Sequence, residues 1–130
     1  MLADRKSVIL CVDDEPNPLT LRKLVLERFG YAVLTATSAE EAMKLLAVNH
    51  VDLVISDYLM PGVVGTELAR SVKAAYPGIP FILLSGVNDI PDDASCADLF
   101  ISKVEGPAMM CTKIAAILSG ELRGVESSRS

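Results

Sequence analysis

Two short apolar runs in this sequence end directly in acidic residues. Residues 8–12 lead into three acids at positions 13–15, and residues 51–56 lead into Asp57. Carboxylates that lie close together repel one another unless a cation lies between them, and a cluster of oxygen ligands suits a hard cation such as Mg²⁺. If the two segments lie side by side, the pattern predicts a divalent metal site beside Asp57.

Both apolar runs have the length and the β-branched composition of buried strands in a parallel sheet. The carboxyl ends of such strands form the ligand crevice of an open α/β sheet, so acids that follow two neighbouring strands would meet there. Strand-like and helix-like segments alternate five times along the chain without a break in composition. We therefore predict an α/β fold with a doubly wound parallel sheet of five strands and helices on both faces.

Apolar spacing and turn residues place the individual elements. The first helix is predicted to follow an Asn17-Pro18 cap and to end at Gly30, with an apolar stripe formed by Leu21, Leu24, Val25 and Phe29. A capping box at residues 38–41 begins the second helix. Residues 87–98 have little apolar periodicity, so only a short or irregular helix is expected there. The predicted strands are residues 8–12, 31–37, 51–57, 81–84 and 99–103, and the remaining helices are one that Pro77-Gly78 ends and one that Gly106-Pro107 begins.

Length, charge and cysteine content limit the class of protein. A chain of 130 residues suits one domain, predicted at residues 1–119, and the polar, serine-rich residues 120–130 are predicted to be a disordered tail or linker. A net charge of −5 without a basic stripe argues against direct nucleic-acid binding. No apolar run approaches the ~20 residues that a membrane-spanning helix needs. The three cysteines, Cys11, Cys96 and Cys111, lack metal-ligand spacing, which favours reduced thiols in a cytoplasmic protein.

The chemically distinctive residues follow a specific order along these predicted elements. They are the pair Asp13-Asp14, Asp57 with Met60-Pro61-Gly62 after it, Ser85-Gly86, and Lys103. From about Ser7 to about Leu118, the sequence resembles the receiver domain of two-component response regulators, which has a flavodoxin-like fold. The resemblance implies a strand order of 2-1-3-4-5. It also implies a signalling domain whose only catalysis is its own Mg²⁺-dependent phosphorylation and dephosphorylation.

The same resemblance implies a role for each acid. Asp57 is implied to accept a phosphoryl group from a sensor histidine kinase, from a histidine phosphotransfer protein or from a small acyl phosphate. Asp13, Asp14 and Asp57 are implied to hold Mg²⁺, or Mn²⁺ in its place, together with the backbone carbonyl of Leu59. The chemistry agrees, because a carboxylate can accept a phosphoryl group and the transfer needs mainly positioning and charge neutralisation.

Three further residues are implied to respond to the phosphoryl group. Lys103 would pair with the phosphoryl oxygens, Ser85 would donate a hydrogen bond to them, and Phe100 would swing inward as Ser85 moves. The partner that reads this switch is expected to be a downstream protein or an output domain outside this sequence, and a homodimer is a further expected partner arrangement.

Other interpretations of the same residues exist. Acids 13–15 and Asp57 could each lie in an ordinary solvated loop. Val104, where the family commonly has proline, and the weak helix pattern after Ser85 suggest a receiver-like docking module that works without phosphorylation. An aspartate-nucleophile phosphatase would need a second acid at the position of Leu59, and a flavin carrier would need hydroxyls and glycines in the first loop. The combined motif favours the phosphorylation-dependent switch.

Overall fold

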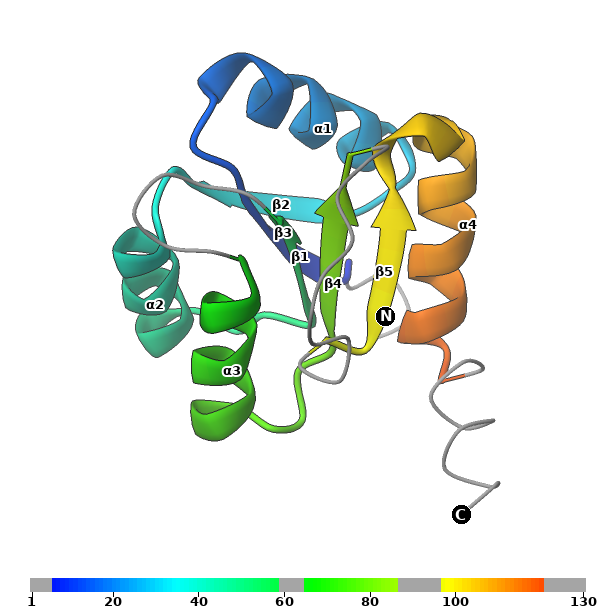
Figure 1. Cartoon of the computed structure of the whole chain (residues 1–130). Helices are drawn as coiled ribbons and strands as arrows, with labels where there is room; N and C mark the ends of the chain where they lie inside the picture. The colour runs from blue at the N-terminus through cyan, green and yellow to red at the C-terminus, as the bar shows by residue number, and fades with distance from the viewer. Residues whose placement is uncertain (1–5, 59–64, 87–96, 121–130) are drawn as a thin grey trace.

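A five-stranded parallel sheet forms the centre of the molecule (Figure 1). The computed structural model describes residues 6–58, 65–86 and 97–120. The strand order is β2-β1-β3-β4-β5, as predicted, and the fold is the flavodoxin-like arrangement. The strands are β1 (Val8–Val12), β2 (Ala32–Ala36), β3 (Leu53–Asp57), β4 (Phe81–Ser85) and β5 (Leu99–Ser102), and the helices are α1 (Pro16–Arg28), α2 (Ala39–Val48), α3 (Gly65–Ala75), the 3₁₀ helix η3 (Lys103–Glu105) and α4 (Gly106–Leu118).

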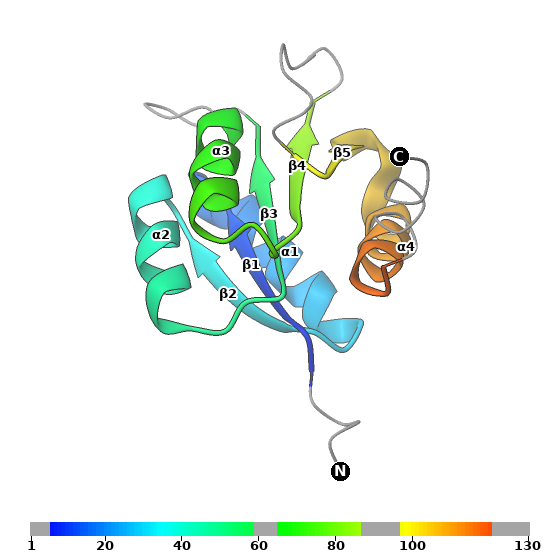
Figure 2. The ribbon, with the colours of Figure 1, turned by 90° about the horizontal axis from the view of Figure 1, so that it is seen from below.

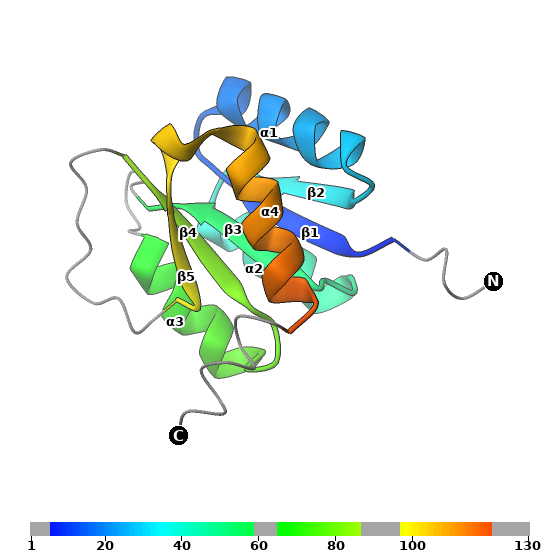
Figure 3. The same ribbon diagram turned by 90° about the vertical axis from the view of Figure 1, so that its right-hand side faces the viewer.

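Helices cover both faces of the sheet, and alternate strand residues supply the two apolar cores. On β1, Ile9 and Cys11 pack toward α1 and α4, whereas Leu10 and Val12 pack toward α2 and α3. Figures 2 and 3 show these two layers, with α1 and α4 as neighbours on one face. Strands β1 and β3 are buried on both faces, so their residues are apolar up to the polar residues at the strand ends. This pattern is what predicted the two strands from the sequence. No described helix has the length and apolar character to cross a membrane.

Helix α1 differs from its prediction in its start and in its buried face. It begins at Pro16 after Glu15, so Asn17 and Pro18 lie inside its first turn and do not cap it. The buried side chains are Leu19 and Leu26, whereas Leu21, Leu24 and Phe29 are more than half exposed. Of the predicted stripe, Val25 alone packs against the core, and it is partly buried. The prediction of this stripe was therefore wrong, because the correct face contains a charged residue, Arg22, between its two leucines.

Most other predicted boundaries agree with the structure to within one or two residues. The capping box of α2 forms with a shifted partner, because Ser38 Oγ accepts from the Glu41 amide at 3.1 Å and Glu41 accepts from the Thr37 amide at 2.7 Å. Strand β5 ends at Ser102, so Lys103 begins η3 instead of ending the strand. The predicted irregular helix falls almost entirely outside the described residues, and so does the predicted tail, except for Gly120.

Two acids at the amino ends of the strands have structural partners. Asp52 Oδ2 accepts from the Val8 amide at 2.7 Å, and Asp98 Oδ2 accepts from the Phe81 amide at 2.7 Å. Asp98 also forms an ion pair with Lys73. These hydrogen bonds fix the first residues of β1 and β4. The same donors compensate the negative charges of Asp52 and Asp98 within the fold.

Val54 tests the packing of the central strand. We expect Val54→Ala to lower the free energy of unfolding by about 2 kcal/mol, because the side chain is fully buried in β3 and its removal leaves a cavity. The same substitution at the exposed Val48 of α2 is the matched control and should cost less than about 0.5 kcal/mol. Urea unfolding measures both changes, and equal effects would contradict the burial of β3.

Candidate functional site

Three carboxylates meet at the carboxyl ends of β1 and β3. Val12 pairs with Ser56 in the parallel register, so the residues that follow, Asp13 and Asp57, end the two strands side by side. One oxygen from each of Asp13, Asp14 and Asp57 lies within 4.8 Å of the others. Asp13 and Asp57 are buried and Asp14 is half-buried. The structure therefore brings together the three acids that were predicted as ligands.

Asp13 is held in place by its own backbone and by a side chain of α1. Its amide donates to the carbonyl of Ala36 at 3.1 Å, which extends the pairing of β1 with β2. Its Oδ1 accepts from the Glu15 amide at 3.0 Å, and its Oδ2 lies 3.3 Å from Nη1 of Arg22. Both oxygens of Asp13 thus have partners within the protein.

Asp57 lies on the central strand with less compensation for its charge. The Tyr58 amide donates to the carbonyl of Leu84 at 2.8 Å and so fixes the end of β3 against β4. Oδ1 of Asp57 forms an ion pair with the Lys103 ammonium, and no described residue donates a well-directed hydrogen bond to this buried oxygen. Burial raises the pKa of the Asp57 carboxyl, although the contact with the Lys103 ammonium offsets part of that rise.

Lys103 reaches the site from the turn after β5. Ser102 caps that turn, because its Oγ accepts from the Val104 amide at 3.3 Å and its amide donates to Oε2 of Glu105 at 3.3 Å. The described residues contain no cis peptide bond, so the Lys103–Val104 bond is trans. With this trans bond, Lys103 contacts Asp57 even though valine replaces the usual proline.

The other predicted site residues lie at different depths. Ser85 is buried at the end of β4, one residue beyond Leu84, which pairs with Asp57 in the sheet register. Phe100 of β5 is half-buried and packs against the core between the sheet and helices α2 and α3. Leu59, whose carbonyl was predicted as a metal ligand, and the Met60-Pro61-Gly62 motif lie outside the described residues.

Arg22 is the residue at this site that the sequence analysis missed. Its side chain is only 10% exposed and pairs with Asp13, which is 3% exposed. The signal was present in the spacing, because Arg22 lies three residues after Leu19 and four before Leu26 on the buried face of α1. A charged residue at such a position requires a buried partner of opposite charge.

The donor set at this site fits a hard divalent cation. The three nearby ligand oxygens all come from carboxylates, which suit Mg²⁺ better than softer metals. The buried Asp57 oxygen without a well-directed hydrogen bond could receive further positive charge. Asp13, Asp14 and Asp57 could therefore hold a metal ion next to an oxygen that is able to act as a nucleophile.

Comparisons with known proteins agree with this geometry. Residues 9–115 match the family model described as the response regulator receiver domain. The transcriptional regulatory protein GlrR of Escherichia coli (strain K12) is 38% identical over 91 residues, which are 70% of this chain and 20% of that protein. AfsQ1 of Streptomyces coelicolor is 30% identical over 92% of this chain and 55% of its own length. The chain thus spans between about a fifth and about half of these regulators.

Solved structures give the same result. The response regulator TrrA of Thermotoga maritima, crystallised in complex with Mg²⁺-BeF, has a TM-score of 0.78 and 35% identity, and the match covers 84% of this chain and 96% of that one. The chain belongs to the response regulator receiver domain family.

The raised pKa of Asp57 makes stability depend on pH. A folded-state pKa above the unfolded one means that the ionised carboxyl destabilises the fold at neutral pH, and this cost disappears below the unfolded pKa of about 4. In EDTA at pH 7, we expect Asp57→Asn to raise the Tm by about 2–4 °C. Thermal scans should show the two proteins converging near pH 4, whereas a lower Tm for the variant at pH 7 would contradict the prediction.

Proposed function

We propose that this domain is a phosphorylation-dependent switch in which Asp57 is the phosphoacceptor. The observation that carries the proposal is the position of Asp57, which lies close to Asp13 and Asp14 and contacts Lys103. The proposed donors are the phosphohistidine of a sensor histidine kinase or histidine phosphotransfer protein, and small acyl phosphates. The family assignment supports this class of donor.

In the proposed reaction, one carboxylate oxygen of Asp57 forms a bond to phosphorus. The phosphorus–nitrogen bond of the phosphohistidine, or the phosphorus–oxygen bond of the acyl phosphate, breaks, and the imidazole or carboxylate leaves with the electron pair. When bound among Asp13, Asp14 and Asp57, Mg²⁺, or Mn²⁺ in its place, would neutralise negative charge on the transferred group. The Leu59 carbonyl is proposed as a further ligand.

The remaining site residues are proposed to report the phosphoryl group. Lys103 exchanges its contact with the Asp57 carboxylate for one with the phosphoryl oxygens, and Ser85 donates its hydroxyl hydrogen to them. Phe100 is half-buried against the core and is proposed to move further inward when Ser85 moves. The switch is thus a shift of population toward a state that the phosphoryl group stabilises.

The receiver is proposed to control a partner protein or an output domain. GlrR and AfsQ1 are transcriptional regulators that are longer than this chain, so an attached output domain is one form that the partner can take. A cytoplasmic location and a homodimer are further parts of the proposal. A docking module that works without phosphate is the second candidate, on the grounds of Val104 and the weak helix pattern after Ser85. The first ground is weakened because Lys103 contacts Asp57 although Val104 follows it.

Labelling by acetyl phosphate tests the acceptor directly. We expect intact-mass measurement to show one phosphoryl adduct on the wild type, and its formation should require Mg²⁺. Without a cation, the three carboxylates repel the negatively charged phosphoryl donor. Asp57→Asn should abolish the adduct, whereas Glu40→Gln, on the exposed face of α2, should leave it unchanged. Equal labelling of wild type and Asp57→Asn would exclude Asp57 as the acceptor.

Lys103 should control the rate of this labelling. Lys103→Met removes a positive charge that contacts Asp57, so we expect phosphorylation by acetyl phosphate at saturating Mg²⁺ to slow by about tenfold or more. Lys44→Met is the matched control, because Lys44 is exposed and pairs with Glu40 on α2. Time courses of the adduct mass measure both rates, and an unchanged rate in Lys103→Met would remove Lys103 from the proposed mechanism.

A further inference from the structure

Arg22 is a buried cation in contact with one of the proposed metal ligands. Its Nη1 lies 3.3 Å from Oδ2 of Asp13, and both side chains are at least nine-tenths buried. Leu19 and Leu26 flank Arg22 on α1 and are themselves buried. The packing of this helix face therefore places the arginine next to Asp13, which follows β1. A buried guanidinium loses its hydration and depends on this carboxylate for compensation.

The partners of Asp13 leave little room for an additional cation without a rearrangement. Oδ1 accepts a backbone hydrogen bond from Glu15, and Oδ2 is paired with Arg22. A metal ion at Asp13 must therefore share Oδ1 with the Glu15 amide, share Oδ2 with Arg22, or replace the guanidinium. As long as the guanidinium stays beside Asp13, the metal ion is repelled by a positive charge a few Å away in a partly buried site.

The charges of the site support the same argument. The three carboxylates of Asp13, Asp14 and Asp57 face the two cations Arg22 and Lys103, which leaves a formal charge of −1 on these five side chains. Without Arg22 the formal charge would be −2, and a divalent cation would be attracted more strongly. Arg22 thus already supplies part of the compensation that the metal would otherwise provide.

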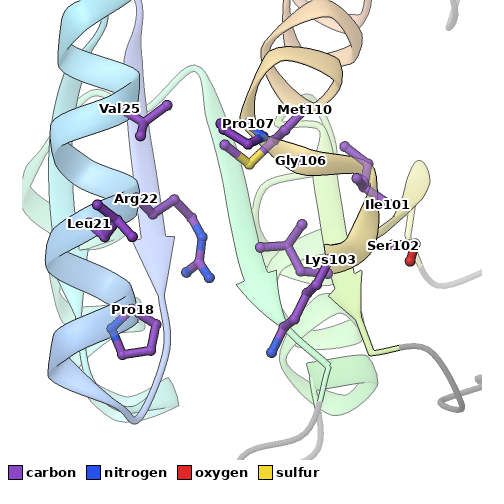
Figure 4. Close-up of a pocket in the computed structure, with 11 residues that line it drawn as sticks. Pro18, Leu21, Arg22, Val25, Ile101, Ser102, Lys103, Gly106, Pro107 and Met110 are labelled. Atoms are coloured by element: carbon purple, nitrogen blue, oxygen red, sulfur yellow. The ribbon is translucent and has the colours of Figure 1, made fainter.

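The structure also offers space into which Arg22 can move. A pocket of about 250 Å³ lies between α1 and the β5–α4 segment, and Arg22 and Lys103 both line it. Figure 4 shows the Arg22 side chain extending from α1 into the space between this helix and Lys103. Apolar side chains, including Leu21, Val25 and Met110, form much of the rest of the lining. The guanidinium can therefore shift away from Asp13 while its aliphatic part remains packed.

We infer that Arg22 is an internal competitor for the divalent cation and sets the metal affinity of this receiver. In the metal-free protein it neutralises Asp13 and stabilises the acidic cluster. On metal binding it gives up or shares that contact, so the site binds the cation more weakly than the same three acids would without the arginine. This inference rests on the proposed function, because it concerns the metal site of the same switch.

Titration calorimetry with Mg²⁺ at constant ionic strength tests the inference. We expect Arg22→Met to lower the Kd by about tenfold, because a positive charge close to the cation is removed. Arg28→Met is the matched control, since it removes the same charge from the exposed end of α1, and it should change the Kd by less than about twofold. An unchanged or higher Kd in Arg22→Met would overturn the inference, because it would mean that Arg22 is neutral toward the metal or helps to bind it.

Stability gives a second readout that does not depend on phosphorylation. In EDTA, Arg22→Met should have a lower Tm than the wild type, because the buried Asp13 loses its partner. Saturating Mg²⁺ should raise the Tm of Arg22→Met by more than it raises that of the wild type. If Arg22→Met does not fold, Arg22→Gln removes the charge and keeps a hydrogen-bond donor, and the same changes in Kd and Tm are expected for it.

The two proposals fail in different ways. If the wild type and Arg22→Met bind Mg²⁺ with equal Kd, the competitor role is wrong and the metal site remains. If neither protein binds Mg²⁺, the proposed metal site and the competitor role are both wrong. Binding by Arg22→Met alone would support the strongest form of competition, in which the arginine excludes the metal.

Discussion

The repulsion among three carboxylates at one edge of the sheet is the constraint to which the rest of the site responds. The parallel register of β1 and β3 brings Asp13 and Asp57 side by side, and Asp14 follows on the same loop. Like charges this close raise the free energy of the fold unless cations accompany them. Two elements that are distant in sequence supply those cations, namely α1 with Arg22 and the turn after β5 with Lys103.

The aspartates at the amino ends of the strands have different partners from those at the carboxyl ends. Asp52 and Asp98, at the amino ends, accept hydrogen bonds from backbone amides and so contribute to the positions of the strands. At the carboxyl end, Oδ1 of Asp57 is paired with the Lys103 ammonium instead of a backbone amide. Since side chains can move more readily than backbone amides, Lys103 can move its contact from Asp57 to another negatively charged group nearby. The same residue type therefore positions strands at one end of the sheet and, in the proposed function, accepts the phosphoryl group at the other.

The sequence could predict what depends on local patterns, and the predictions failed where a tertiary contact between elements decides the outcome. Strands β1 and β3 and the three acids followed from apolar runs that end in acid. The buried face of α1 was wrongly predicted because Arg22 interrupts it, and an arginine there is acceptable only when Asp13 lies opposite. In the same way, no local pattern showed that Lys103 would reach Asp57 from a trans turn capped by Ser102.

Lys103 and Arg22 differ in their freedom to respond to a new charge at the site. The Lys103 side chain is 43% exposed, so it can follow Asp57 or a group attached to Asp57 while it remains hydrated. Arg22 is 10% exposed and lies between buried leucines of α1, so a change in its contact with Asp13 alters a packed surface. Because packed interfaces change between discrete arrangements, loss of the Arg22–Asp13 contact would act on the packed surface between α1 and the sheet, whereas the exposed part of Lys103 can move in solvent. The two cations thus connect the acidic cluster to α1 through Asp13 and to the turn after β5 through Asp57.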